Sequence, residues 1–85
     1  MPNNKTQWSA RFEGSHFYLR TPYEEVFVCE LKEIVPARSR FWDGWYKEWR
    51  IDASYWDEVE DLLAGWWGDG TVLDTVPHRA TVGSN

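Results

Sequence analysis

Six side chains in one short segment have the chemistry to bind nucleic acid. Between residues 38 and 50, cations are interleaved with aromatic rings. Lysine and arginine side chains contact phosphate oxygens, and exposed rings stack on bases regardless of sequence. The candidate phosphate contacts are Arg38, Arg40, Lys47 and Arg50, and the candidate stacking platforms are Trp45 and Tyr46. The alternative is that these cations are ordinary solvated strand residues and that the rings belong to a core or a lid.

A second candidate site is a dense run of carboxylates. It consists of Asp57, Glu58, Glu60 and Asp61. Together with Asp52, such a run can imitate a row of phosphates and bind a basic protein partner. Trp67 would be an anchor for such a partner, because tryptophan is enriched among interface hot spots. The alternative is a solvated helix face whose first carboxylates interact favourably with the helix dipole. The alternative function is therefore that of an acidic, Trp-rich protein-interaction or inhibitor protein. Such a protein could originate from a phage or a mobile element.

The sequence shows no arrangement of residues for catalysis or metal binding. His16 and His78 are isolated from each other and from any catalytic partner. Cys29 falls in the middle of a predicted helix, where a small buried or half-buried residue is expected rather than a nucleophile. One cysteine and two distant histidines do not make a zinc site. We therefore expect a non-enzymatic protein with no catalytic residues, no metal and no cofactor.

Composition narrows the class of protein further. The chain has 85 residues and a net charge of −5. Residues 1–50 carry eight cations and seven anions, whereas residues 51–85 carry one cation and seven anions. This excludes a uniformly basic nucleic-acid binder but allows a locally basic face. The single cysteine favours a reducing compartment, and the polar N-terminus disfavours a signal peptide or membrane span, so a cytoplasmic protein is expected.

The predicted elements form a single α+β domain over residues 7–76, between a disordered N-terminus (1–6) and a flexible tail (77–85). Strands are expected at 7–12 and 16–20, and Phe17 and Leu19 should share one face. Helix 1 is predicted to begin at Thr21 and Pro22 with a capping box, and to end before Pro36. Its buried stripe would contain Tyr23, Phe27, Leu31 and Ile34.

The aromatic segment itself predicts a β-hairpin with strands at 39–42 and 48–51. A two-residue Asp43-Gly44 turn would set Arg40 opposite Lys47, which is unfavourable. A longer loop instead places Trp42, Trp49 and Ile51 on one side, facing the helices, and leaves residues 45–47 at or near the loop tip. We therefore expect the longer loop, with Trp42 and Trp49 in the core.

A second helix is predicted to follow this hairpin. Ser54 would cap it, with Asp57 in the box position, and Gly65 would end it. Of the adjacent Trp66 and Trp67, one is expected to be buried and the other exposed. Residues 68–70 form a turn, and residues 71–76 form a possible edge strand. The predicted fold is an antiparallel sheet of ββαββα order with two helices on one face.

The order of these motifs resembles the HARP domain, a module that precedes the motor in annealing helicases. The resemblance covers residues 16–64. It includes Thr21-Pro22-Tyr23, a helix ending in Ile34-Val35-Pro36-Ala37-Arg38, the spacing Trp42-Asp43-x-x-x-Lys47-x-Trp49, and Ser54-Tyr55 before an acidic helix.

The resemblance implies binding to DNA at fork-like, partly single-stranded structures. It would place Arg38, Arg40, Lys47 and Arg50 near a phosphate backbone. The chain contains no GxxxxGK[ST] loop, so no motor accompanies the module in this sequence. A standalone module of this kind is expected to bind, recruit or inhibit rather than to rewind DNA.

Overall fold

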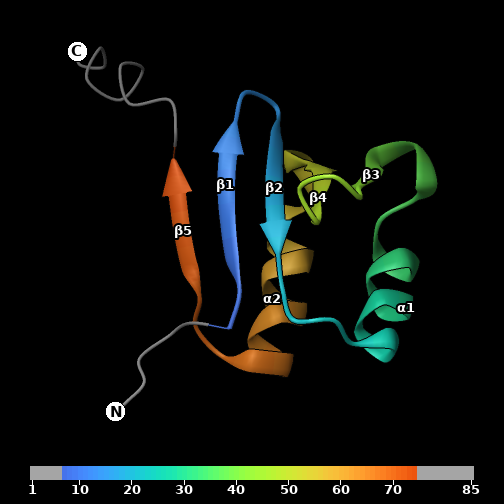
Figure 1. Ribbon diagram of the computed structural model, residues 1–85, viewed down its shortest axis with the longest axis vertical. Helices are drawn as coiled ribbons and strands as arrows, with labels where there is room; N and C mark the ends of the chain where they lie inside the picture. Colours follow the sequence, from blue (N-terminus) through green and yellow to red (C-terminus); the bar gives the residue numbers. More distant parts are fainter. Residues whose placement is uncertain (1–6, 75–85) are drawn as a thin grey trace.

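The computed structural model describes residues 7–74 and shows a five-stranded sheet with two helices (Figure 1). The strand order is β3-β4-β2-β1-β5. All pairings are antiparallel except that of β1 with β5. The buried apolar strand residues lie on one face and share a core with both helices, and the other face carries polar and charged side chains. The predicted α+β class and ββαββα order are confirmed, and so is the possible C-terminal edge strand, which runs parallel to its neighbour.

The first hairpin consists of β1 (Ser9–Glu13) and β2 (His16–Arg20). Gly14 has a φ of 63° in the connecting turn, a conformation that glycine adopts without a steric penalty. Phe17 and Leu19 are both fully buried, which confirms the predicted face.

Helix α1 (Glu25–Ile34) begins later than predicted. The cap residue is Glu24, which has extended backbone angles, and Thr21 Oγ1 donates to the Pro22 carbonyl instead of capping the helix. Tyr23 therefore lies outside the helix and is 81% exposed, so its place in the buried stripe was wrong. Cys29 is also exposed, contrary to prediction. The predicted end is confirmed, because Val35 before Pro36 is extended.

A short 3₁₀ helix, η1 (Ala37–Ser39), leads into the second hairpin, which consists of β3 (Arg40–Asp43) and β4 (Glu48–Asp52). Trp42 pairs with Trp49, so the longer loop is confirmed. Trp49 is only 9% exposed and belongs to the core. Trp42 is 46% exposed, so its assignment to the core was wrong. The reason is its position on β3, which is an edge strand and has a neighbour on one side only.

The second helix begins differently from the prediction. Asp52 Oδ1 accepts the Ser54 backbone N–H at the start of a 3₁₀ turn, η2 (Ala53–Tyr55), so Ser54 is not the cap of the main helix. Helix α2 (Trp56–Trp67) follows and continues through Gly65 to Gly68, whose φ is 80°. Trp66 and Trp67 are therefore helical, and both are half-buried rather than one buried and one exposed.

The last described strand, β5 (Thr71–Asp74), lies parallel to β1 at the sheet edge. Its start is fixed by Trp8, whose carbonyl accepts the Thr71 N–H and whose Nε1 donates to the Gly68 carbonyl at 2.9 Å. The expectations for residues 1–6 and for residues 75–85 lie outside the described residues.

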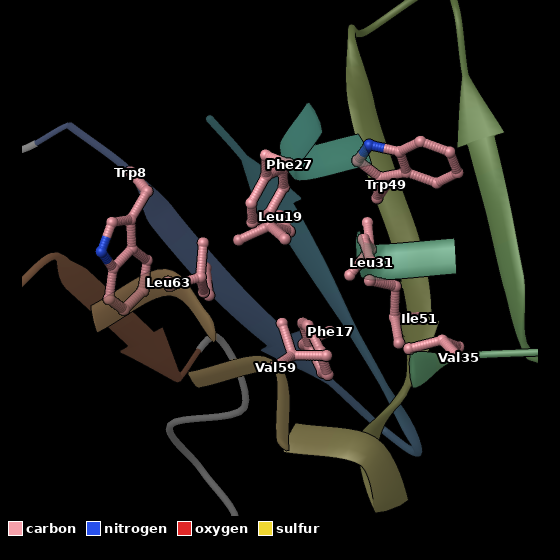
Figure 2. Packing of buried hydrophobic residues seen from close by; sticks show 11 residues of the cluster. Trp8, Phe17, Leu19, Phe27, Leu31, Val35, Trp49, Ile51, Val59 and Leu63 are labelled. Carbon is pink, nitrogen blue, oxygen red and sulfur yellow. The ribbon is translucent and has the colours of Figure 1, made fainter. Parts of the chain in front are cut away.

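The core lies between the sheet and the helices (Figure 2). Trp8 is at one end of the labelled cluster and Trp49 at the other, with Phe17, Leu19 and Phe27 between them. The half-buried Trp56 adds edge-on ring contacts to Phe12 and Phe17 at centroid distances of 5.0 and 4.9 Å. Large rings thus supply much of the core that a chain of this length needs.

Candidate nucleic-acid interface

The loop between β3 and β4 is held in one conformation by its own residues. Asp43 Oδ1 accepts the backbone N–H groups of Trp45 (2.9 Å) and Tyr46 (3.1 Å). Lys47 then has a φ of 59°, in the left-handed region that few non-glycine residues adopt. The side chains of Trp45 and Tyr46 are 86% and 59% exposed. Both predicted stacking platforms are therefore at the loop tip and accessible.

Three of the four predicted cations come together at the opposite end of the hairpin. A hollow of about 50 Å³ is lined by Arg38, Ser39, Arg40, Phe41, Arg50 and His16. No carboxylate is among these lining residues. The hollow has room for a phosphate-sized group, and the arginines among its lining residues favour an anion.

Local structure orients these arginines. Pro36 ends the preceding segment, and η1 then carries Arg38 at an exposed position next to β3. Arg40 Nε donates to the Val35 carbonyl at 3.0 Å, which holds its guanidinium against the base of the hairpin. The Arg50 guanidinium lies over the Phe41 ring, 5.2 Å from its centroid. Cation–π contact of this kind restrains an otherwise flexible side chain.

The fourth cation, Lys47, is separate from the arginines. Arg40 and Asp43 are three residue steps apart along β3, which is about 10 Å of strand. Lys47 lines an apolar groove on the helix side of the hairpin, whereas Tyr46 lines a hollow on the open face of the sheet. The six predicted residues therefore form a cationic end and an aromatic end of one hairpin rather than a single patch.

The open face carries an ionic network that the sequence did not indicate. Glu48 is only 3% exposed, and it is paired with Arg20 (3.2 Å) and Arg11 (3.5 Å). Arg11 also bonds Glu13 at 2.8 Å, and this bond, aided by Glu48, raises the pKa of Arg11 above its ordinary value. The network links β1 and β2 to β4, so it fixes the strand from which Arg50 projects. Only the pairing of strands distant in sequence brings these charges together.

The apolar groove was also missed by the sequence analysis. Its volume is about 520 Å³, and its lining residues are Thr21, Pro22, Tyr23, Val28, Lys32, Trp42, Lys47 and Trp49. The sequence pattern predicts Tyr23 and Trp42 as core residues, so it does not indicate either as a binding residue. The only sequence signal was the surplus of rings over what a small core can enclose.

The acidic candidates lie on helix α2, and all four are exposed. Asp57 and Glu58 are in its first turn, where a carboxylate interacts favourably with the helix dipole. Trp67 packs on the Phe27 ring at a centroid distance of 4.8 Å, so it contributes to the core and offers only part of its surface to a partner. Asp52 is used at the start of η2, where the Ser54 backbone N–H lowers the pKa of the carboxyl below its ordinary value.

Within residues 7–74, no group of three or more histidine, cysteine, aspartate or glutamate side chains is placed to hold a metal ion. None of the helices in this part of the chain has the length and apolar character needed to cross a bilayer.

Fold and site together define a small α+β domain with several tryptophans, whose second hairpin carries a cationic hollow and an exposed aromatic loop. Comparisons of the chain with protein-family models, with curated proteins and with solved structures each found no match. The HARP resemblance therefore stays a prediction that rests on the motifs alone.

Proposed function

We propose that this chain is a non-enzymatic module that binds DNA containing single-stranded or fork-like parts through the β3–β4 hairpin. The observation that carries the proposal is the hollow where Arg38, Arg40 and Arg50 meet without a lining carboxylate. The sequence predicts these residues as phosphate contacts, although they are up to twelve positions apart in the chain. Their convergence on a phosphate-sized hollow is what a backbone contact requires.

The exposed loop rings support a preference for unpaired bases. Trp45 and Tyr46 occupy the far end of the same hairpin, and the Asp43 hydrogen bonds hold their backbone in place. A single strand contacting both ends would place phosphates at the arginines and bases at the rings. The HARP resemblance favours fork-like DNA among the possible ligands. A cytoplasmic location, which the single cysteine favours, belongs to the same proposal.

The test is a titration of labelled fork, single-stranded and duplex DNA, followed by fluorescence anisotropy at about 50 and 200 mM salt. Arg38→Ala and Arg50→Ala are the informative variants, because both residues are exposed and neither is bound to the backbone as Arg40 is. Each should weaken binding to all three DNAs and reduce the slope of log affinity against log salt by about 0.7–0.9. Trp45→Ala should weaken binding of the strands with unpaired bases by about 1–3 kcal/mol.

The matched control is Ala64→Glu, at an exposed position of α2, because it changes the net charge by the same amount as losing one arginine. No binding at low salt would refute the proposal. So would arginine variants whose affinity and salt dependence equal those of Ala64→Glu.

A second candidate function is the binding of a basic protein by the acidic face of α2. It is favoured by the four exposed carboxylates, none of which takes part in the ion pairs seen within residues 7–74. Asp57→Lys with Glu60→Lys should abolish capture of such a partner and leave DNA binding intact or stronger. A partner captured equally well by this double variant would contradict the second function.

A further inference from the structure

The apolar groove next to the hairpin has the composition of a binding site for a flat anionic ligand. It lies where the segment before α1 meets the helix side of β3 and β4. At about 520 Å³, it is within the usual size range of small-molecule sites, which are mostly apolar with a few polar groups. Trp49 lines it and is nearly buried, whereas Tyr23, from the segment before α1, and Trp42, from β3, are exposed rings.

The charge of the groove has a single sign. Its only charged lining residues are Lys32 from α1 and Lys47 from the hairpin loop. Lys47, which has a left-handed backbone, lines this groove, whereas its neighbour Tyr46 lines a hollow on the opposite face of the sheet. A non-glycine residue in this conformation is uncommon and is often found where function requires it. Two ammonium groups beside three rings complement a ligand that has a planar apolar body and an adjacent negative charge.

We propose that this groove holds one unpaired nucleobase, with the neighbouring phosphates at Lys32 and Lys47. The inference rests on the proposed function and gives it a second contact area, distinct from the arginine hollow and from the loop tip. A base stacked in a duplex cannot enter such a groove, whereas a bulged or single-stranded base can. The groove therefore provides selectivity for unpaired DNA, and the arginine hollow provides affinity for any phosphate backbone.

The experiment compares two DNA duplexes that differ only in the presence of one nucleobase. One contains a single-nucleotide bulge, and the other contains the same bulge without its base, so that the number of phosphates is identical. The chain should bind the bulge with a base roughly 5- to 100-fold more tightly than the abasic bulge, as expected for stacking of one base. Tyr23→Ala should reduce this ratio toward one, and Lys32→Ala should weaken binding of the intact bulge.

The controls separate this inference from the proposed function. Val26→Ala removes an exposed apolar side chain of α1 that does not line the groove, so it should leave the ratio unchanged. Arg50→Ala should weaken both duplexes by the same factor and preserve the ratio. Circular dichroism of each variant checks that the fold is retained, and Lys32→Ala provides a second measurement if Tyr23→Ala does not fold.

Each possible result is informative. A preference that survives both Tyr23→Ala and Lys32→Ala overturns the groove inference and leaves the proposed function standing. Equal affinity for the two duplexes overturns the groove inference and base stacking on Trp45 and Tyr46, and leaves only the phosphate contacts of the arginines standing. Binding of an acidic aromatic peptide in the groove, without binding of bulged DNA, also overturns it. Failure to bind any DNA at low salt overturns both proposals.

Discussion

Gly70 lies directly against the indole ring of Trp8, and this contact makes a sharp prediction about stability. An ideal Cβ on Gly70 would overlap the ring, and even the third-nearest ring atom, Cε3, would be only 2.7 Å away. The ring cannot move freely, because Trp8 is almost fully buried and its Nε1 donates to the Gly68 carbonyl. Gly70→Ala must therefore shift either the indole or the backbone that starts β5.

The expected loss of stability depends on which of these two shifts occurs. Local adjustment around an overpacked site costs about 1–3 kcal/mol. Expulsion of the ring would expose roughly 150–250 Å² of surface, which is worth about 4–6 kcal/mol at 25 cal/mol/Å². We expect Gly70→Ala to destabilise the domain by about 2–4 kcal/mol. At about 4–8 °C per kcal/mol for a domain of this size, the unfolding temperature should fall by at least about 8 °C.

Gly65→Ala is the matched control for Gly70→Ala, because it makes the same substitution at a nearby glycine. An added Cβ at Gly65 meets no atom within 4 Å, and the residue is inside helix α2, where alanine is preferred by about 0.8–1 kcal/mol. Urea and thermal unfolding, followed by tryptophan fluorescence and circular dichroism, should therefore show opposite shifts for the two variants. Unchanged stability of Gly70→Ala would refute the packing of Trp8 on Gly70 and the placement of β5 that depends on it.

Three other perturbations test the surroundings of the hairpin. Glu48→Gln removes the buried carboxylate that pairs with two arginines. We expect it to lower the free energy of unfolding in urea by only about 1–2 kcal/mol, since the partner Arg20 is half-exposed and screened by solvent. Arg20→Ala should lower this free energy by less. Asp43→Ala deletes the acceptor of two loop N–H groups, so backbone relaxation measured by NMR should show a more mobile loop tip, whereas Asp43→Asn should retain its order. The pKa of Asp52 in the folded state is below its ordinary value of 3.8, so its stabilising contribution is present above that pH and is lost as the pH falls through the lower folded value. Asp52→Asn keeps an acceptor for the Ser54 N–H. As the pH is lowered, the unfolding temperature of this variant should fall less steeply than that of the parent chain. An equal dependence on pH in the two chains would contradict this role of Asp52.

Much of the fold followed from local signals in the sequence. Alternation predicted β2 with Phe17 and Leu19 on the buried face, and Pro36 predicted the end of α1. The like-charge argument against a two-residue turn correctly selected the longer hairpin loop. These features depend on residues close in the chain, which is why the sequence sufficed.

The boundaries that failed have a common cause. The capping motif at Thr21 and the stop at Gly65 are statistical preferences of isolated helices, and tertiary packing outweighs them. In the folded chain, Trp66 and Trp67 pack around Phe27, and α2 extends past Gly65 to Trp67. The edge position of β3 likewise left Trp42 partly exposed, although its neighbour Trp49 is buried.

For the candidate site, too, some features depend on the local sequence and others on the tertiary structure. The sequence by itself determined which side chains are candidates for contacting phosphates and bases, because residue type and the hairpin pattern are local properties. Only the tertiary structure decided that Arg38, Arg40 and Arg50 share a hollow while Lys47 lines a groove with Tyr23 and Lys32. Those residues lie up to 24 positions apart in the chain, and their arrangement is set by strand pairing and helix packing rather than by any local preference.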